Sequence, residues 1–171
     1  GTARHVARLA RVAEPRPEPS MPVRLEAAAS GVLDDLALRP MRRRAPGPGE
    51  LEIEVFAAGL NFRDVMNAVA LRADPEPLGG ECAGRIVAVG DGVDGLAAGD
   101  DVIALADGCL ASFTTTEARN PAPLPRGMRH VDGATLPIAF VTAHYALEVL
   151  GHLAVGESVL VHAAAGGVGM A

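Results

Sequence analysis

Lysine is absent from the 171-residue chain, so arginine carries all of its positive side-chain charge. Together with an excess of alanine and glycine, this absence indicates a codon bias toward GC-rich triplets. The formal net charge is -6, and the one basic run, at residues 42–44, lies among prolines and glycines, which predicts a solvent-exposed turn. A nucleic-acid-binding protein needs a clustered basic face, so the composition argues against a nucleic-acid partner.

Cysteine and histidine are too few and too scattered to predict a metal centre. Cys82 and Cys109 fit no metal-ligand spacing and no CxxC motif, which predicts two unpaired thiols. The five histidines form no HxxxH pair and no cluster with cysteine. No stretch reaches the ~20 apolar residues that a membrane span needs. We therefore expect no metal, no membrane partner and a cytoplasmic location.

Proline separates the start of the chain from the rest. The segment EPRPEPSMP, at residues 14–22, predicts an extended and semi-rigid stretch, because proline fixes φ and lacks a backbone N–H. We expect residues 1–19 to be an interdomain linker. The start has no apolar core of a signal peptide and no initiator methionine, so the chain is expected to be part of a longer protein.

Residues 20–130 are predicted to form a β-rich module. In LEIEVFAAGLNF, at 51–62, Leu51, Ile53 and Val55 alternate with Glu52 and Glu54, which is typical of a strand with one buried face. Further strands are expected at 23–28, 31–41, 79–90 and 101–105, with a short helix at 61–71. Many short strands separated by Gly, Pro and Asp turns indicate a small barrel or sandwich.

From residue 131 the pattern changes to that of an α/β unit. Apolar residues at three- and four-residue spacing predict a largely buried helix over 132–153, and VLVH at 159–162 predicts a buried strand. The strand leads into AAAGGVG, a variant of the G-x-G-x-x-G dinucleotide fingerprint with a small residue at its first position. Such a turn suits a pyrophosphate, because glycines allow close approach and a helix N-terminus offers N–H groups. The alternative is a tight crossing from strand to helix.

Five ordered segments together resemble the zinc-independent branch of the medium-chain dehydrogenase/reductase superfamily. They are most similar to enoylreductase domains of modular polyketide synthases, with quinone oxidoreductases next. The segments lie at 57–64, 77–93, 95–105, 134–147 and 156–171. The resemblance implies a mainly β GroES-like substrate domain at 20–130, followed at 131–171 by the first helix and strand of a truncated Rossmann NADPH-binding domain.

The resemblance also implies an activity. NADPH would reduce the α,β-double bond of an enoyl thioester that phosphopantetheine tethers to an acyl carrier protein in polyketide biosynthesis. Ketoreductase and dehydratase domains would be the neighbours. A stand-alone quinone oxidoreductase and a non-catalytic GroES-like binding module remain alternatives. Without the rest of the Rossmann domain, the 171-residue chain alone is expected to be inactive and to bind NADPH weakly or not at all.

Site residues follow from the same resemblance. Asn61 matches the N-x-x-D segment beside the nicotinamide and is the candidate catalytic residue, although it could instead cap the turn after a strand. Asp64 is expected to cap the following helix or to hold Arg63. Thr142 matches a threonine near the nicotinamide end, or it bonds back to a helix carbonyl. The pyrophosphate loop corresponds to Ala165, Gly166, Gly167, Val168 and Gly169.

Two positions depart from patterns of the superfamily. Gly80 stands where zinc-dependent relatives have a histidine, so metal catalysis is not expected, and Glu81 is expected to be a buried structural carboxylate bonded to backbone N–H groups. Many relatives have a tyrosine proton donor where this chain has Arg72, at the end of Ala70-Leu71-Arg72. We hypothesise that the proton comes from water or from a residue beyond position 171. Any α-methyl branch would then have the configuration of members that lack the tyrosine.

Overall fold

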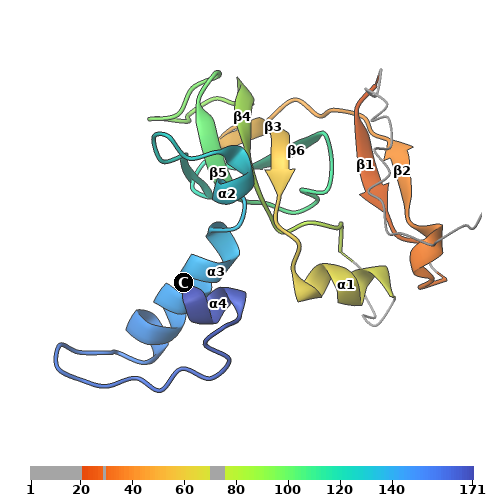
Figure 1. Ribbon diagram of the computed structural model, residues 1–171. Coiled ribbons are helices and arrows are strands. Elements are labelled where there is room, and N and C mark those ends of the chain that lie inside the picture. The colour runs from red at the N-terminus through yellow and green to blue at the C-terminus, as the bar shows by residue number, and fades with distance from the viewer. Residues whose placement is uncertain (1–20, 29, 70–75) are drawn as a thin grey trace, which may run out of the picture.

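The computed structural model describes residues 21–28, 30–69 and 76–171, which form a β-rich body and a helical C-terminal lobe, residues 137–171 (Figure 1). The body holds the strands β1 to β7 and the helices α1 and α2. The lobe holds α3 and α4 and projects away from the sheet (Figure 1). The linker predicted at 1–19 lies outside the described residues.

A five-stranded antiparallel sheet forms the centre of the body. Its order is β6-β3-β4-β5-β7, so that β3 pairs with both β4 and β6. The strands are β3 (Glu50–Ala58), β4 (Glu81–Val89), β5 (Asp101–Leu105), β6 (Phe113–Glu117) and β7 (Pro121–Pro123). The core consists of small and medium-sized side chains from these strands and their loops: Leu51, Ile53, Cys82, Ile86, Val102, Ala104, Ala106 and Cys109. The predicted β-rich module is therefore confirmed.

The two cysteines belong to this core and are unpaired, as predicted. Neither is accessible to solvent, and the Cys109 thiol donates to the carbonyl oxygen of Ala106 at 3.0 Å. A hydrogen bond with Cys82, together with burial, raises the pKa of the Cys109 thiol far above its usual range. A thiol that is hard to ionise is a poor nucleophile, so these residues act as small core side chains.

Glu52 corrects one detail of the predicted alternation in β3. The pattern placed this side chain on the solvent face, yet it is only 4% exposed. The Arg43 guanidinium covers it, with Nη2–Oε2 at 2.7 Å and Nε–Oε1 at 2.9 Å, and also lies 4.0 Å from the centre of the Phe113 ring. The basic run at 42–44 therefore serves partly to pair with carboxylates of β3.

A separate hairpin, β1 (Val23–Glu26) with β2 (Ala37–Pro40), precedes the sheet. The second strand was predicted over 31–41 but begins only at Ala37, because Leu33–Asp35 form a 3₁₀ turn. The hairpin is attached to the segment before β6 by three bonds. Leu25 N–H donates to the Leu110 carbonyl oxygen, Val23 N–H donates to the Ser112 hydroxyl, and Ser112 N–H donates to the Val23 carbonyl oxygen.

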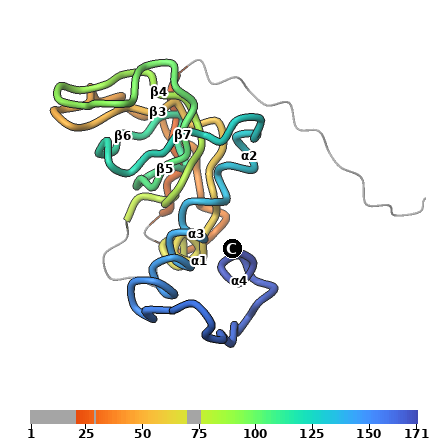
Figure 2. The backbone as a smooth tube through the Cα atoms, turned by 90° about the vertical axis from the view of Figure 1, so that its left-hand side faces the viewer, coloured from red at the N-terminus to blue at the C-terminus, as the bar shows by residue number. Residues whose placement is uncertain are grey.

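The apolar segment predicted as one buried helix forms in pieces. They are α2 (His130–Gly133), α3 (Pro137–His144) and the π-helical turn η2 (Tyr145–Leu150). The prediction of burial was wrong, since Tyr145 and Val149 are 52% and 47% exposed. Ile138, in the first turn of α3, is bonded to Glu81 at the start of β4, and Figure 2 shows the later turns of α3 extending below the body.

Residues 159–162 correct a second prediction. They form no strand, and Leu160 is 82% exposed. A strand is stabilised by ladder bonds to its neighbours, and no other segment of the described residues pairs with this one. Figure 2 shows the segment within the long loop that runs from η2 to the short helix α4 (Gly167–Met170).

By length and composition, His130–Leu150 could cross a membrane, with a mean hydropathy of 1.3, whereas the sequence analysis predicted no such segment. A single helix of this kind is a weak indication, because core helices of water-soluble proteins pass the same test. Here the segment is tied to the sheet near its start, where Ile138 N–H donates to the carboxylate of Glu81 at 2.8 Å.

Candidate functional site

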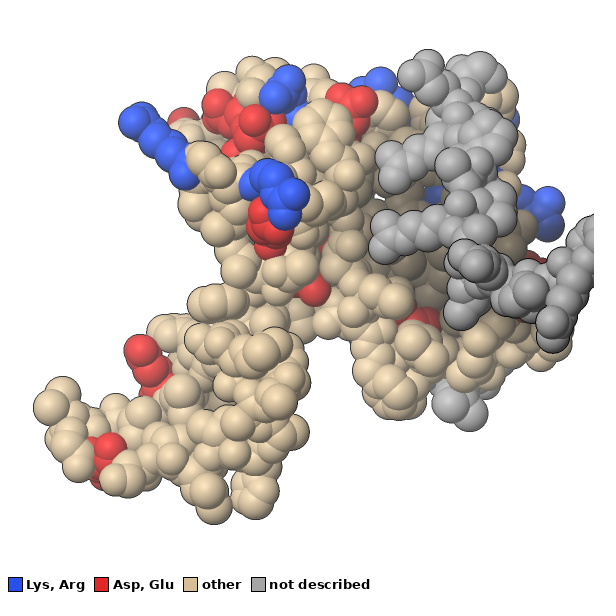
Figure 3. All heavy atoms as spheres, in the orientation of Figure 1, with Lys and Arg blue, Asp and Glu red and all other residues tan. Residues whose placement is uncertain are grey.

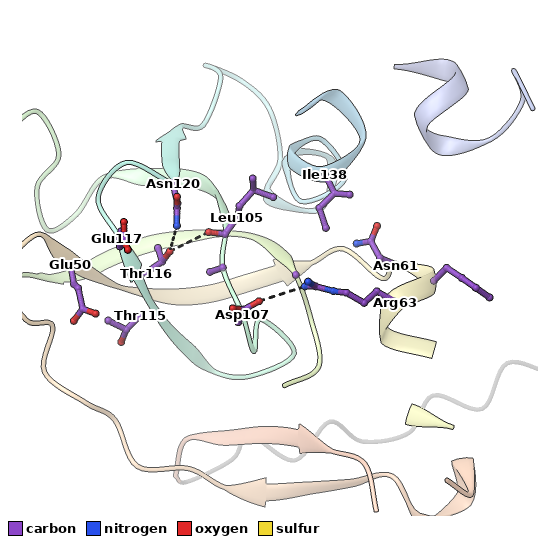
Figure 4. A pocket seen from close by; sticks show the side chains of 13 residues that line it. Glu50, Asn61, Arg63, Leu105, Asp107, Thr115, Thr116, Glu117, Asn120 and Ile138 are labelled. Atoms are coloured by element: carbon purple, nitrogen blue, oxygen red, sulfur yellow. Dashed lines mark hydrogen bonds and ion pairs between the residues drawn. The ribbon is translucent and has the colours of Figure 1, made fainter. Parts of the chain in front are cut away.

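A cavity of about 760 Å³ opens where the sheet, α1 (Phe62–Ala68) and the first turn of α3 meet. Its walls come from the residues that begin α1, from Gly80 before β4, from the end of β5, from β6 and from Ile138 of α3. Figure 4 shows Asn61, Arg63 and Ile138 at one end of this cavity and Glu50 and Thr115 at the other. The sequence-predicted residue Asn61 therefore lies at a site large enough for a small-molecule ligand.

Asn61 is held in place by the helix that it precedes. It is the N-cap of α1, and its backbone N–H donates to the carboxylate of Asp64 at 2.8 Å. The other oxygen of Asp64 accepts the backbone N–H of Gly79 at 2.8 Å, and the side chain is 2% exposed. The prediction that Asp64 caps the helix is confirmed. Arg63 instead contacts Glu76 and Asp107.

Glu81 joins three elements at the cavity. One of its oxygens accepts the Asn61 side-chain N–H at 2.8 Å, and the other accepts the backbone N–H of Ile138 at 2.8 Å. The side chain is 4% exposed. The predicted burial of Glu81 and its bond to a backbone N–H are confirmed, the latter by Ile138. Its side-chain partner, Asn61, was not predicted. Asn61 lies 20 residues away in sequence and no local pattern connects the two.

Gly80 and Arg63 form the adjoining part of the wall. A Cβ at Gly80 would lie 2.6 Å from Nη2 of Arg63 and 3.1 Å from Cδ1 of Ile138, so the guanidinium occupies the space of a side chain at position 80. The glycine at position 80 is evident from the sequence, but the guanidinium that fills the space beside it is not. In residues 21–28, 30–69 and 76–171, no group of three His, Cys, Asp or Glu side chains is arranged to hold a metal ion.

Thr142, a predicted site residue, lines neither of the two cavities near the predicted site. These are the cavity beside Asn61 (the Asn61 cavity) and a second cavity beside the glycine loop, residues 165–169. The Thr142 side chain is exposed on α3. It does lie four residues after Ile138, which is one turn farther along the same helix face. The tyrosine-donor position, Arg72, lies outside the described residues, as do Ala70 and Leu71.

The predicted pyrophosphate loop lies beside a second, mostly apolar cavity of about 590 Å³. Gly166 is the N-cap of α4, and Gly167, Val168 and Gly169 form its first turn, whose N–H groups have no partner within the helix. A Cβ at Gly169 would lie 2.5 Å from the Ala163 carbonyl oxygen, whereas a Cβ at Gly167 would meet no atom within 4 Å. The turn thus needs its last glycine and leaves open space beside Gly167, which fits close approach by a phosphate. Ala165 precedes this turn and is exposed.

One helical segment carries walls of both cavities. Ile138 lines the first, and Ala143, five residues later, lines the second, which is a rise of about 7.5 Å along the axis. Residues 130–171 contain no lysine or arginine, and the lobe shows only acidic charge on the face in Figure 3. Within this segment, backbone N–H groups and the side chain of His162, which lines the second cavity, are therefore the groups that could bind a phosphate.

Glu50, at the far end of the first cavity, offers a test of the local electrostatics. The Arg44 guanidinium, at 2.6 Å, and the Gly47 N–H lower the pKa of Glu50 to about 2. A lowered pKa stabilises the fold above the ordinary pKa of about 4.5, and this contribution is lost as pH falls toward 2. In urea unfolding from pH 6 to pH 2, the stability difference between wild type and Arg44→Gln should shrink as pH falls. Arg42→Gln is the matched control, and a pH-independent difference for Arg44→Gln would contradict the assignment.

Residues 47–150 match the family profile of the alcohol dehydrogenase GroES-like domain. The NorB protein of the spectinabilin polyketide synthase system, from Streptomyces orinoci, is 46% identical over 150 residues, which cover 86% of this chain and 7% of that protein. The predicted fold class, a GroES-like β module with a few helices, is therefore confirmed.

Solved structures show the same similarity. The CurK enoyl reductase superposes with a TM-score of 0.83 at 44% identity, over 88% of this chain and 49% of that one. A mycobacterial protein solved in complex with NADPH superposes with a TM-score of 0.76 at 34% identity, over 86% of this chain and 47% of that one. The chain thus spans about half the length of these structures and less than a tenth of the synthase protein.

Proposed function

The chain belongs to the family of alcohol dehydrogenase GroES-like domains, and from this premise we propose that it forms part of an NADPH-dependent enoyl reductase of polyketide biosynthesis. The observation that carries the proposal is the 44% identity to a solved enoyl reductase over 88% of the chain. The substrate would be an α,β-unsaturated acyl thioester on the phosphopantetheine arm of an acyl carrier protein. Ketoreductase and dehydratase domains would be neighbours in a cytoplasmic synthase.

The two cavities are proposed to bind different molecules, the acyl thioester and NADPH. Residues 20–130 would hold the acyl thioester and residues 131–171 would begin the NADPH-binding domain. When bound, NADPH would supply the hydride that reduces the substrate's double bond. The first-turn N–H groups of Gly167, Val168 and Gly169 would bind its pyrophosphate, with Ala165 and Gly166 shaping the turn before them.

Asn61 would orient the reactants in the Asn61 cavity. Glu81 accepts one N–H of the Asn61 side-chain amide, and Oδ1 faces the backbone N–H of Asp64 in the capping box of α1. The second N–H therefore remains for the nicotinamide carboxamide or the thioester. The amide is neutral and adds no charge beside the reacting carbons. Thr142, one turn beyond Ile138, is proposed to contact the nicotinamide end. Water or a residue outside this sequence would supply the proton, because Arg72 stands where relatives have a tyrosine.

The proposal is tested with the longest obtainable polypeptide that contains these 171 residues, NADPH and a crotonyl-pantetheine thioester. We expect NADPH oxidation that depends on the thioester and yields the saturated acyl product. A benzoquinone in place of the thioester is the control. Turnover of quinone alone would indicate a quinone oxidoreductase, and turnover of neither would indicate a binding module; both results would contradict the proposal.

A further inference from the structure

Arg63 is the one cationic side chain among the described residues that line the Asn61 cavity. Three carboxylates share these walls: Glu50, Asp107 and Glu117. Arg44 pairs with Glu50 at 2.6 Å and Arg119 pairs with Glu117 at 2.6 Å, so two of the three already have close cationic partners. If negative charge develops on a ligand in this cavity, Arg63 is the lining side chain that can stabilise it.

Gly80 has no side chain, and this leaves room for the Arg63 guanidinium. Nη2 of Arg63 stands where a Cβ at position 80 would be only 2.6 Å away, so any larger residue at this position would displace the guanidinium. The next residue, Glu81, holds the Asn61 amide. Gly80, just before β4, thus leaves room for Arg63, while Glu81, the first residue of β4, holds Asn61. Figure 4 shows both side chains at the same end of the cavity.

The ion pairs of Arg63 are looser than others in the protein. Nη1 lies 3.3 Å from Oε2 of Glu76, and Nη2 lies 3.5 Å from Oδ1 of Asp107, whose side chain is 73% exposed. By contrast, Arg44 and Arg129 reach their carboxylates at 2.6 and 2.7 Å. A guanidinium has five N–H donors and stays charged at all physiological pH values, so Arg63 keeps donors for a ligand oxygen without a change of protonation.

We propose that Arg63 donates a hydrogen bond to the thioester carbonyl oxygen of the enoyl substrate and stabilises the negative charge that this oxygen gains during reduction. This inference rests on the function proposed above. The hydride that NADPH would supply would form a C–H bond at the β-carbon, and the electron pair of the carbon–carbon π bond would move toward the thioester oxygen. A proton from water then bonds to the α-carbon and the carbonyl re-forms. A fixed cation at the carbonyl oxygen favours this charge more than the ground state, which lowers the barrier.

Kinetics of four single variants and one double variant test the role of Arg63 in the NADPH-oxidising polypeptide. Arg63→Gln should lower kcat about 10²- to 10³-fold, as loss of one oxyanion donor does, and leave KM for NADPH within about twofold. Arg63→Lys should recover part of the loss because it restores the charge. Gly80→Ala should also lower kcat, but much less in the Arg63→Gln background, because its effect passes through the guanidinium. Arg129→Gln, a surface arginine paired with Asp132, is the control and should match wild type.

A second readout needs no turnover and uses the 171-residue chain. The Nε–Hε signal of Arg63, assigned with Arg63→Gln, should shift when a saturated butyryl-pantetheine thioester is added, while the Arg129 signal should not. If the wild-type polypeptide reduces no enoyl thioester, the proposed function fails and this inference fails with it. If wild type is active and Arg63→Gln keeps its kcat within threefold, or the Arg63 signal stays unmoved by the thioester, the inference alone is overturned.

Discussion

Replacing Glu81 by glutamine is expected to keep the fold and to reverse the amide of Asn61. In the wild type both Glu81 oxygens accept hydrogen bonds, one from the Ile138 N–H and one from the Asn61 amide nitrogen. A glutamine has one acceptor and one NH₂ group. If its oxygen keeps the Ile138 N–H, its NH₂ faces Asn61, and the Asn61 amide must turn its oxygen toward it. The free N–H of Asn61 is then moved from the position in which wild type offers it to the cavity.

This reversal should reduce catalysis much more than stability. We expect kcat of the NADPH-oxidising polypeptide to fall about 10- to 100-fold, which matches the loss of one hydrogen bond of about 1.5–3 kcal/mol. The free energy of unfolding of the 171-residue chain should change by less than about 1 kcal/mol, because each buried group keeps a partner. Stopped-flow reduction of a crotonyl thioester and urea unfolding measure the two quantities.

Two further variants make the result specific. Glu81→Ala leaves the Ile138 N–H without its partner and should cost about 2–3 kcal/mol of stability, the penalty of an unsatisfied buried donor together with a small cavity. Glu54→Gln removes one negative charge from the neighbouring strand and should leave kcat unchanged. Equal kcat values for wild type and Glu81→Gln would show that the orientation of Asn61 does not matter for the reaction.

The second large effect concerns the cofactor. The 171-residue chain is expected to bind NADPH with a dissociation constant weaker than about 0.1 mM, or only about -5.5 kcal/mol. The loop offers the N–H groups of one helical turn, and residues 130–171 contain no lysine or arginine. The walls of the loop cavity are themselves open to solvent, since Leu160 is 82% exposed and Val161 49%. These residues bury little of a bound nucleotide.

Titration of NADPH fluorescence, supported by calorimetry, measures this affinity. The comparison is a longer polypeptide that contains the same residues and oxidises NADPH, which should bind at least tenfold more tightly. A matched Gly169→Ala variant of that polypeptide should lose binding, because the added Cβ meets the Ala163 carbonyl oxygen at 2.5 Å and must shift the turn. Micromolar affinity of the 171-residue chain would contradict the expectation.

Much of the β module could be predicted because its signals are local. The period-2 pattern of β3 and the glycine-bounded segment of β4 each identify a strand within about ten residues. Glu52 escaped this reasoning because its burial depends on Arg43, nine residues earlier, whose guanidinium covers it. The helix from 137 and the segment at 159–162 were expected to be buried because their sequences are apolar. Burial also requires a covering surface, which sequence composition does not report.

The site was predictable residue by residue but not as an arrangement. Asn61, Asp64 and the glycine loop were identified from motifs, and the capping role of Asp64 was confirmed. The partners of Glu81 lie 20 and 57 residues away, and the guanidinium beside Gly80 comes from another element. Such contacts depend on how the sheet and the helices pack. The roles of Asn61, Thr142 and the loop in binding NADPH stay predictions.

The most direct test of the account is the position of the transferred hydrogen. NADPH deuterated at C4 of the nicotinamide is incubated with a crotonyl-pantetheine thioester and a polypeptide that contains these 171 residues, and the product is analysed by NMR and mass spectrometry. We predict one deuterium at the β-carbon and one solvent-derived hydrogen at the α-carbon. Deuterium at the α-carbon, or an unreduced thioester under conditions where a quinone is reduced, would contradict the assignment as an enoyl reductase.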